Sequence, residues 1–243
     1  MADGGTNDLM GIIPALQQKV EKIVSVYNFN QSPPYADFQT TYGEIYKKAP
    51  CTSKSDPNFK KHFREWIKYI NPRFTCLFGY FGTRLINHSN LPNHVFNDPK
   101  LDHLKDIMIK FNSLYEAGEP LVATMNGLQT IDNPFWGVEG GNKVNLTLVW
   151  FNLPRKFAEQ LPKELGLGLN KDGCFTNEEM KMTNFPELLN SPQDSTGYTP
   201  EQINMMAYLG SWIIHQAWEG LDGHDGKVKF EGFRSIFEGS QIP

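Results

Sequence analysis

The chain has 243 residues, a formal net charge of −4, and a composition that is 40% hydrophobic and 13% aromatic. This composition is enough to bury a substantial core and excludes an intrinsically disordered chain. The acidic balance excludes a dedicated double-stranded DNA binder, whose whole domain would be basic. Cys51, Cys76 and Cys174 are odd in number and widely spaced, which indicates free thiols in a reducing compartment.

The N-terminal stretch predicts a helix followed by an extended connector. Apolar residues recur at helical spacing from Leu9 to Tyr27, and Pro14 marks either a kink or the true start of the helix. A Pro-Pro pair then makes residues 29–36 extended. We therefore expect residues 1–54 to form an N-terminal helix and connector, suited to act as an assembly arm, and residues 55–243 to form a helical core.

Residues 58–74, NFKKHFREWIKYINPRF, place lysines and arginines among aromatic residues. Asp56-Pro57 predicts a helix start. An apolar stripe at helical spacing follows, formed by Phe59, Phe63, Trp66, Ile67 and Ile70. Lys60, Arg64 and Lys68 recur every fourth residue and form a second stripe beside the first. The pattern fits either a core-facing helix with a solvated charged face or a nucleic-acid-binding surface.

The charge distribution favours a binding surface in this part of the chain. Residues 60–84 carry six basic side chains against Glu65 alone, a local balance of +5 in an acidic chain, which indicates a site for a polyanion. A groove for single strands needs cations along the phosphates and aromatic faces for the bases. We expect most of the nearby rings, Phe74, Phe78, Tyr80 and Phe81, to lie in the core, with at most one or two meeting a base. The candidate nucleic-acid-binding residues are Lys60, Lys61, Arg64, Lys68, Arg73 and Arg84.

Helix signals dominate the chain beyond this segment. Asp98-Pro99 opens a helix that stops at Gly118. Its expected inward face contains Leu101, Leu104, Met108, Phe111 and Tyr115. Residues 121–142 are rich in Gly, Asn and Pro, so they predict loops or a hairpin and are the candidate position for a division of the helical core into lobes. Residues 143–153 alternate apolar and polar side chains and are the best strand candidate.

The C-terminal third predicts two more helices. Pro154 opens one that extends through residue 165, and Thr199-Pro200-Glu201-Gln202 has the form of a capping box for a long final helix. The expected inward face of that helix contains Ile203, Met206, Gly210, Ile213, Ile214, Ala217 and Trp218. The predicted fold class is mainly α, with about six or more helices and a minor β element near 143–153. We expect a compact single domain or two helical lobes, with extended terminal segments.

Two Asp-Gly segments align with the EF-hand calcium loop. In residues 168–179, Glu179 falls at position twelve, but Gly168 stands at position one, where a side-chain oxygen belongs. Residues 221–232 fit less well, because Leu221 and Gly232 stand at positions one and twelve. Tight turns explain both Asp-Gly pairs more simply, so we predict no metal site.

Catalytic patterns are weak throughout the sequence. His88, His94, His103 and Asp98 lie near one another, but without a zinc-binding spacing. Cys76 lies in the apolar run FTCLFGYF, which favours a buried thiol over a nucleophile. Neither a phosphate-binding loop nor a GxSxG elbow occurs. We therefore name no catalytic residue and no cofactor, and favour a binding protein over an enzyme.

The preferred interpretation is a non-enzymatic binding and assembly protein of the nucleocapsid or coat kind. It would bind single-stranded RNA on the basic and aromatic surface at 60–84 and associate with itself. The alternative is a helical protein-interaction module with degenerate EF-hand-like loops at 168–179 and 221–232, and a third is an enzyme with a scattered site. The N-terminus lacks the apolar stretch of a signal peptide, and no apolar run is long enough to span a bilayer. We expect no membrane partner and a location in the cytoplasm or within a virion.

Overall fold

The computed structural model describes residues 11–27, 72–79, 93–151, 154–161, 200–224, 226 and 228–238. The helix expected to start at Asp56-Pro57 and to contain the two stripes lies outside these residues. The chain divides into two compact units. Unit 1 comprises Met1–Val26, Asp56–Ile109 and Ala123–Leu148, and unit 2 comprises Tyr27–Ser55, Lys110–Val122 and Val149–Pro243.

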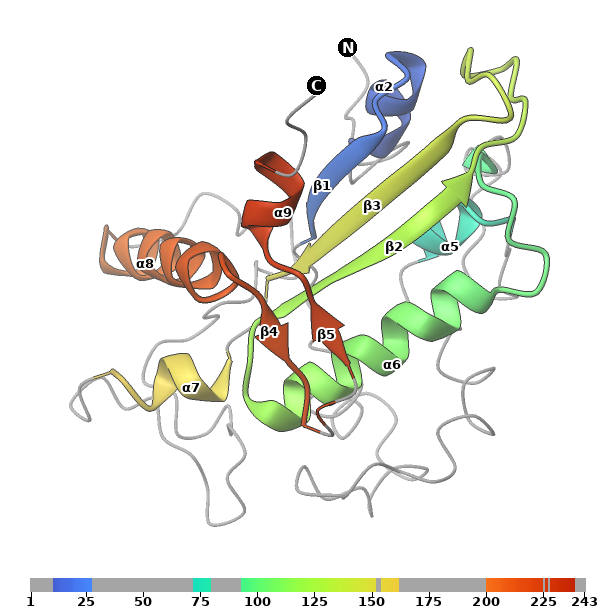
Figure 1. Ribbon diagram of the computed structural model, residues 1–243. Helices are drawn as coiled ribbons and strands as arrows, with labels where there is room; N and C mark the ends of the chain where they lie inside the picture. Colours follow the sequence, from blue (N-terminus) through green and yellow to red (C-terminus); the bar gives the residue numbers. More distant parts are fainter. Residues whose placement is uncertain are drawn as a thin grey trace, which may run out of the picture. The chain divides into compact units, whose positions relative to one another are not determined.

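Unit 1 begins with helix α2 (Ile12–Gln17), which leads into strand β1 (Lys22–Tyr27) (Figure 1). A tight turn separates the two, and Lys19 within it has a φ of 55°. A single helix through Tyr27 is therefore wrong. In β1 the side chains alternate, with Ile23 and Ser25 buried and Val26 exposed, and β-branched residues favour a strand here.

A three-stranded sheet has the order β1-β3-β2. Strand β2 (Leu121–Gln129) and strand β3 (Lys143–Trp150) run in opposite directions (Figure 1), which agrees with the hairpin and the strand that the sequence predicts here. Strand β3 is the centre of the sheet, not a minor element. The hydroxyls of Thr124 and Thr147, 2.8 Å apart, form a hydrogen bond between β2 and β3.

Two helices lie between β1 and β2 in the described part of the chain: α5 (Pro72–Cys76) and α6 (Asp102–Ala117). Helix α6 ends where the sequence predicts but begins at Asp102, beyond the expected start at Asp98-Pro99, because Leu101 has a φ of 56°. Leu104, Met108 and Phe111 are buried as expected, whereas Leu101 and Tyr115 are only half-buried. It stops at Gly118, whose φ is 73°. The N–H groups of Gly118 and Glu119 donate to the carbonyls of Tyr115 and Leu114, both at 2.9 Å, which satisfies the last turn of the helix.

The rest of unit 2 contains α7 (Arg155–Ala158), α8 (Pro200–Gln216) and α9 (Phe233–Phe237), with a hairpin of β4 (Leu221–Asp222) and β5 (Lys229–Phe230). Helix α7 begins after Pro154 as predicted but ends at Ala158, well before residue 165. The buried ring of Phe157 joins α7 to α8, because it lies 5.3 Å from the ring of Tyr208 and 5.4 Å from that of Trp212.

Helix α8 buries a face that matches the predicted one only in part, since Ile213 and, just beyond the helix, Ala217 are buried as expected. Its buried apolar residues are Leu209, Trp212 and Ile213, whereas Ile203 is 52% exposed and Ile214 is 43% exposed. No charged residue occurs between Glu201 and His215, so helical periodicity alone allows more than one inward face. Packing on Phe157 selects the face that contains Trp212.

The fold class is mixed α/β, and the prediction of a mainly α fold is wrong. The described residues contain six helices together with a three-stranded and a two-stranded sheet. Two segments account for the error. The sequence interpretation extended a helix through β1 and gave residues 121–142, which contain β2, only as loops or a hairpin, because short apolar runs fit either period.

Candidate functional site

The basic segment at 60–84 meets the described structure at helix α5. Lys60, Lys61, Arg64, Lys68 and Arg84 lie outside the described residues. Arg73 is the second residue of α5, and its backbone alone is described. The described structure next to the basic segment therefore consists of α5 and the residues that contact it.

Helix α5 is held in the core of unit 1 by aromatic rings. The buried rings of Phe74 and Phe78 lie 5.3 Å apart and edge to face, and Phe78 lies 5.2 Å from Phe96. Just beyond the helix, the carbonyl of Leu77 accepts the N–H groups of Val95 at 3.0 Å and Phe96 at 2.8 Å. Phe74 and Phe78 are thus core residues, as expected, and neither is available to stack on a base.

The loop between β2 and β3 is fastened to the segment that follows α5. Asn133 donates through Nδ2 to the carbonyl of His94 at 2.9 Å, and Trp136 donates through Nε1 to Oδ1 of Asn93 at 2.9 Å. Gln17 donates to the carbonyl of Trp136 at 2.6 Å. These contacts fix a loop tip on which the neighbouring ring, Phe135, is 69% exposed.

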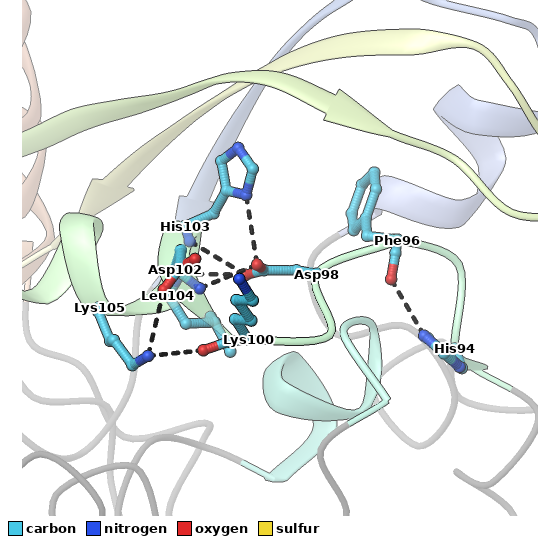
Figure 2. A network of polar contacts seen from close by, with 8 residues as sticks. All are labelled: His94, Phe96, Asp98, Lys100, Asp102, His103, Leu104 and Lys105. Atoms are coloured by element: carbon cyan, nitrogen blue, oxygen red, sulfur yellow. Dashed lines mark hydrogen bonds and ion pairs between the residues drawn. The ribbon is translucent and has the colours of Figure 1, made fainter.

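His94 fills a structural position in this region. A Cβ at Gly79 would lie 2.7 Å from its imidazole, so the ring and the glycine backbone are in close contact. Its Nε2 lies 3.0 Å from the carbonyl oxygen of Phe96, as Figure 2 shows. Both contacts hold the segment beside α5 in place, which explains this histidine without a metal.

Asp98 caps helix α6 with its side chain (Figure 2). The buried carboxylate accepts the N–H groups of Asp102, His103 and Leu104 at 2.9, 3.1 and 3.4 Å. These are free donors of the first helical turn, and an anion is favourable at this end of the helix dipole. Nδ1 of His103 lies 3.5 Å from the carboxylate, and no described residue forms a hydrogen bond with it. The Asp98–His103 pair seen in the sequence is therefore explained as a helix cap.

Replacing Asp98 by alanine should lower the free energy of unfolding by about 2 kcal/mol, because one change removes the acceptor for all three N–H groups. Urea denaturation followed by circular dichroism measures this. The matched control is Asp102→Ala, since the Asp102 side chain is exposed and pairs with Lys105 on the surface at 3.2 Å. That variant should lose less than about 0.5 kcal/mol. Equal losses in the two variants would contradict the capping role.

The second EF-hand-like segment, residues 221–232, forms a β-hairpin. Leu221 pairs with Phe230 and Asp222 with Lys229, and the N–H of Gly223 donates to the carbonyl of Val228 at 2.8 Å. Residues 168–179 lie outside the described part of the chain. Among the described residues, no group of three or more His, Cys, Asp or Glu side chains could hold a metal ion.

Unit 2 contains a buried ion pair that the sequence did not reveal. Glu119, just beyond the end of α6, has a side chain only 8% exposed, and its Oε1 pairs with Nζ of Lys156, which is 44% exposed. Within the described residues, Oε2 of Glu119 has no hydrogen-bond partner. The N–H of Lys156 also donates to the carbonyl of Gly118 at 3.1 Å, so the pair fastens α7 to the end of α6.

Cys76 is fully buried in α5, as its apolar run predicts. Burial raises the pKa of its thiol to about 11, because the charged thiolate is poorly solvated there. The thiol is therefore protonated at neutral pH, and it lacks the activation that a nucleophilic cysteine requires.

Comparison with protein-family models, with curated proteins and with solved structures found no match to this chain. Within the described residues, no helix has both the length and the apolar character needed to cross a bilayer. The function therefore has to be inferred from the residues of this chain and not from a relative.

The sequence interpretation missed Phe135, Glu119 and Lys156. A signal for Phe135 existed, because two adjacent aromatic residues stand between Pro134 and Gly137 in a segment read as a loop. Rings in such a position often have no core to enter. For Glu119 and Lys156 no local signal exists, since the two residues are 37 positions apart and meet only through the fold.

Proposed function

We propose that this chain is a non-enzymatic binding and assembly protein that binds single-stranded RNA on the segment 60–84. The observation that supports it is the charge of that segment, +5 in a chain whose net charge is −4. Phosphate contacts from lysine and arginine supply much of the affinity for RNA. A nucleocapsid or coat protein, working in the cytoplasm or within a virion and associating with itself, matches a local cationic site on an otherwise acidic chain.

Attachment of the segment to folded structure also supports this proposal. Helix α5, which contains Arg73, is fixed by Phe74 and Phe78 in the core of unit 1. Cations that are attached to a rigid element bind phosphates with a smaller loss of conformational entropy than cations on a free tail. A positive segment continuous with a packed helix is thus better suited to hold an RNA strand than an isolated basic run.

The test is a triple substitution, Lys60→Gln, Arg64→Gln and Lys68→Gln. Each lost phosphate contact should flatten the dependence of log affinity on log salt by about 0.7, so the slope should change by about 2. Affinity should fall for every RNA sequence, since phosphate contacts carry no sequence information. Fluorescence anisotropy of labelled oligoadenylate and oligouridylate over a salt series measures both effects.

The matched control removes the same charge elsewhere: Lys105→Gln, Lys229→Gln and Arg234→Gln. Lys105 and Lys229 pair with carboxylates at 3.2 and 3.8 Å, and the exposed Arg234 pairs with Glu219 and Glu238 at 3.1 and 2.6 Å. The control triple should keep most of the affinity and the wild-type salt slope. If both triples weaken binding equally, net charge and not the segment at 60–84 accounts for the interaction. If the wild type has no affinity for RNA, the proposal is wrong.

A further inference from the structure

Phe135 is an exposed aromatic residue on a rigid loop of unit 1. Three hydrogen bonds through Asn133, Trp136 and Gln17 fasten the loop, as described above. The loop also closes on itself, because Asn133 and Val138 form a bridge with backbone hydrogen bonds of 2.9 and 3.1 Å. The side chain at the tip nevertheless remains 69% exposed.

The packing of Phe135 leaves much of its ring open to a ligand. The nearest described ring is Trp136, whose centroid lies 5.0 Å away with the planes at 86°. An edge-to-face contact of this kind occupies at most one face of a ring. A rigid ring with an open face loses little entropy on binding, which is the property of an aromatic anchor in a recognition surface.

We propose that Phe135 is the platform on which a base of single-stranded RNA stacks. This inference rests on the proposed function above. Strands bound without sequence preference need both cations and aromatic faces, and Phe74 and Phe78 are excluded because they are buried. Phe135 supplies the aromatic face that the basic segment itself lacks among its described residues.

Phe135 and helix α5 belong to one connected part of unit 1. The carbonyl of Leu77, just beyond α5, accepts the N–H groups of Val95 and Phe96. The neighbouring carbonyl of His94 accepts Nδ2 of Asn133, two residues before Phe135. A base on Phe135 and phosphates near α5 would therefore be held by the same rigid set of contacts.

The loop itself is acidic, so the attraction for phosphate has to come from the segment at 60–84. Residues 130–142 contain two carboxylates, Asp132 and Glu139, and no lysine or arginine. Oδ1 of Asp132 accepts the N–H of Gly140 at 2.8 Å, and Glu139 pairs with Lys19 at 2.7 Å. In this arrangement Phe135 supplies stacking and the segment at 60–84 supplies the cations.

The test compares Phe135→Ala and Phe135→Leu with the wild type in binding to oligoadenylate and oligouridylate. Alanine should lower the affinity about tenfold, the usual effect of removing one stacked base contact. Leucine should lose nearly as much, because it keeps apolar area without an aromatic face, and Phe135→Trp should retain the affinity. The salt slope should stay unchanged in all three variants, in contrast to the basic triple, since no phosphate contact is lost.

The matched control is Phe237→Ala, because Phe237 is 63% exposed in unit 2, on α9. It should bind RNA as the wild type does. Equal affinity in wild type, Phe135→Ala and Phe135→Leu would overturn the stacking role and leave RNA binding by the basic segment intact. Loss with alanine but not with leucine would also overturn it, because an apolar contact would then suffice. Absence of RNA binding by the wild type would overturn both proposals.

Discussion

Replacing Gly232 by alanine is expected to lower the free energy of unfolding by about 3–5 kcal/mol. Gly232 has φ 91° and ψ 152°, a backbone conformation open almost only to glycine. A Cβ there would lie 2.4 Å from the carbonyl oxygen of Trp218. The segments at 217–218 and 232–234 cannot move apart freely, because the N–H groups of Phe233 and Arg234 donate to the carbonyls of Ala217 and Trp218, both at 3.0 Å.

Two effects contribute to the loss at Gly232: the strain of a positive φ and the close contact of a Cβ with the carbonyl of Trp218. Gly226→Ala separates these two effects. Gly226 also has a positive φ, 65°, but no atom lies within 4 Å of the position that a Cβ would take. Its replacement should cost only the strain of the left-handed conformation, about 1–2 kcal/mol. Urea denaturation of both variants at pH 7 gives the comparison. Losses of the same size would show that the close approach of the two backbones adds nothing to the conformational strain.

Replacing Lys156 by methionine should lower the free energy of unfolding by about 2–4 kcal/mol. The change leaves the Glu119 carboxylate buried without the cation with which it pairs. The value lies slightly below that for a fully buried pair, because Lys156 is half exposed and part of its charge is already hydrated. Chemical denaturation of the two proteins measures the difference.

A double-mutant cycle tests whether the Glu119–Lys156 pair causes the loss of stability in Lys156→Met. Glu119→Gln should cost only about 1 kcal/mol, because Lys156 can turn into water once the carboxylate is gone. Adding Glu119→Gln to Lys156→Met should restore most of the loss, since no buried charge remains. The control is Lys229→Met, whose partner Asp222 is 74% exposed and 3.8 Å away, and it should change stability by less than about 0.5 kcal/mol. A Lys156→Met protein as stable as Lys229→Met would contradict this account.

Local signals in the sequence predict an element when the residues at its ends and the spacing of its apolar residues indicate the same type of element. Helix α6 is one, because Asp98 caps its start, Gly118 stops it, and Leu104, Met108 and Phe111 recur at a helical period. Strand β3 is another, because its alternation follows a polar, glycine-rich loop. In both, a single set of residues specifies the type of element. The limits and buried face are less exact, because α6 begins at Asp102 and the second half of β3, Thr147 included, is buried throughout.

Other features depend on contacts between distant residues. The residues of β1 fit a helical period, and it is pairing in the sheet with β3 that extends them. The buried face of α8 depends on where Phe157 lies, and the burial of Glu119 depends on Lys156. Asp98 and His103 resemble part of a catalytic or metal site in sequence, but the start of α6 uses the carboxylate as its cap. Such outcomes require the tertiary fold, which local propensity does not determine.

The order of strands has a consequence for the chain while it is being synthesised. Strand β1 ends at Tyr27, and its partner in the described sheet, β3, begins at Lys143, about 120 residues later. At a translation rate of about 5–20 residues per second, β1 leaves the ribosome roughly 6–24 s before β3 can pair with it. An apolar strand with unsatisfied backbone groups is prone to aggregate during such an interval. The strand order therefore leaves the backbone edge of β1 without its sheet partner on the nascent chain until residues 143–150 have emerged.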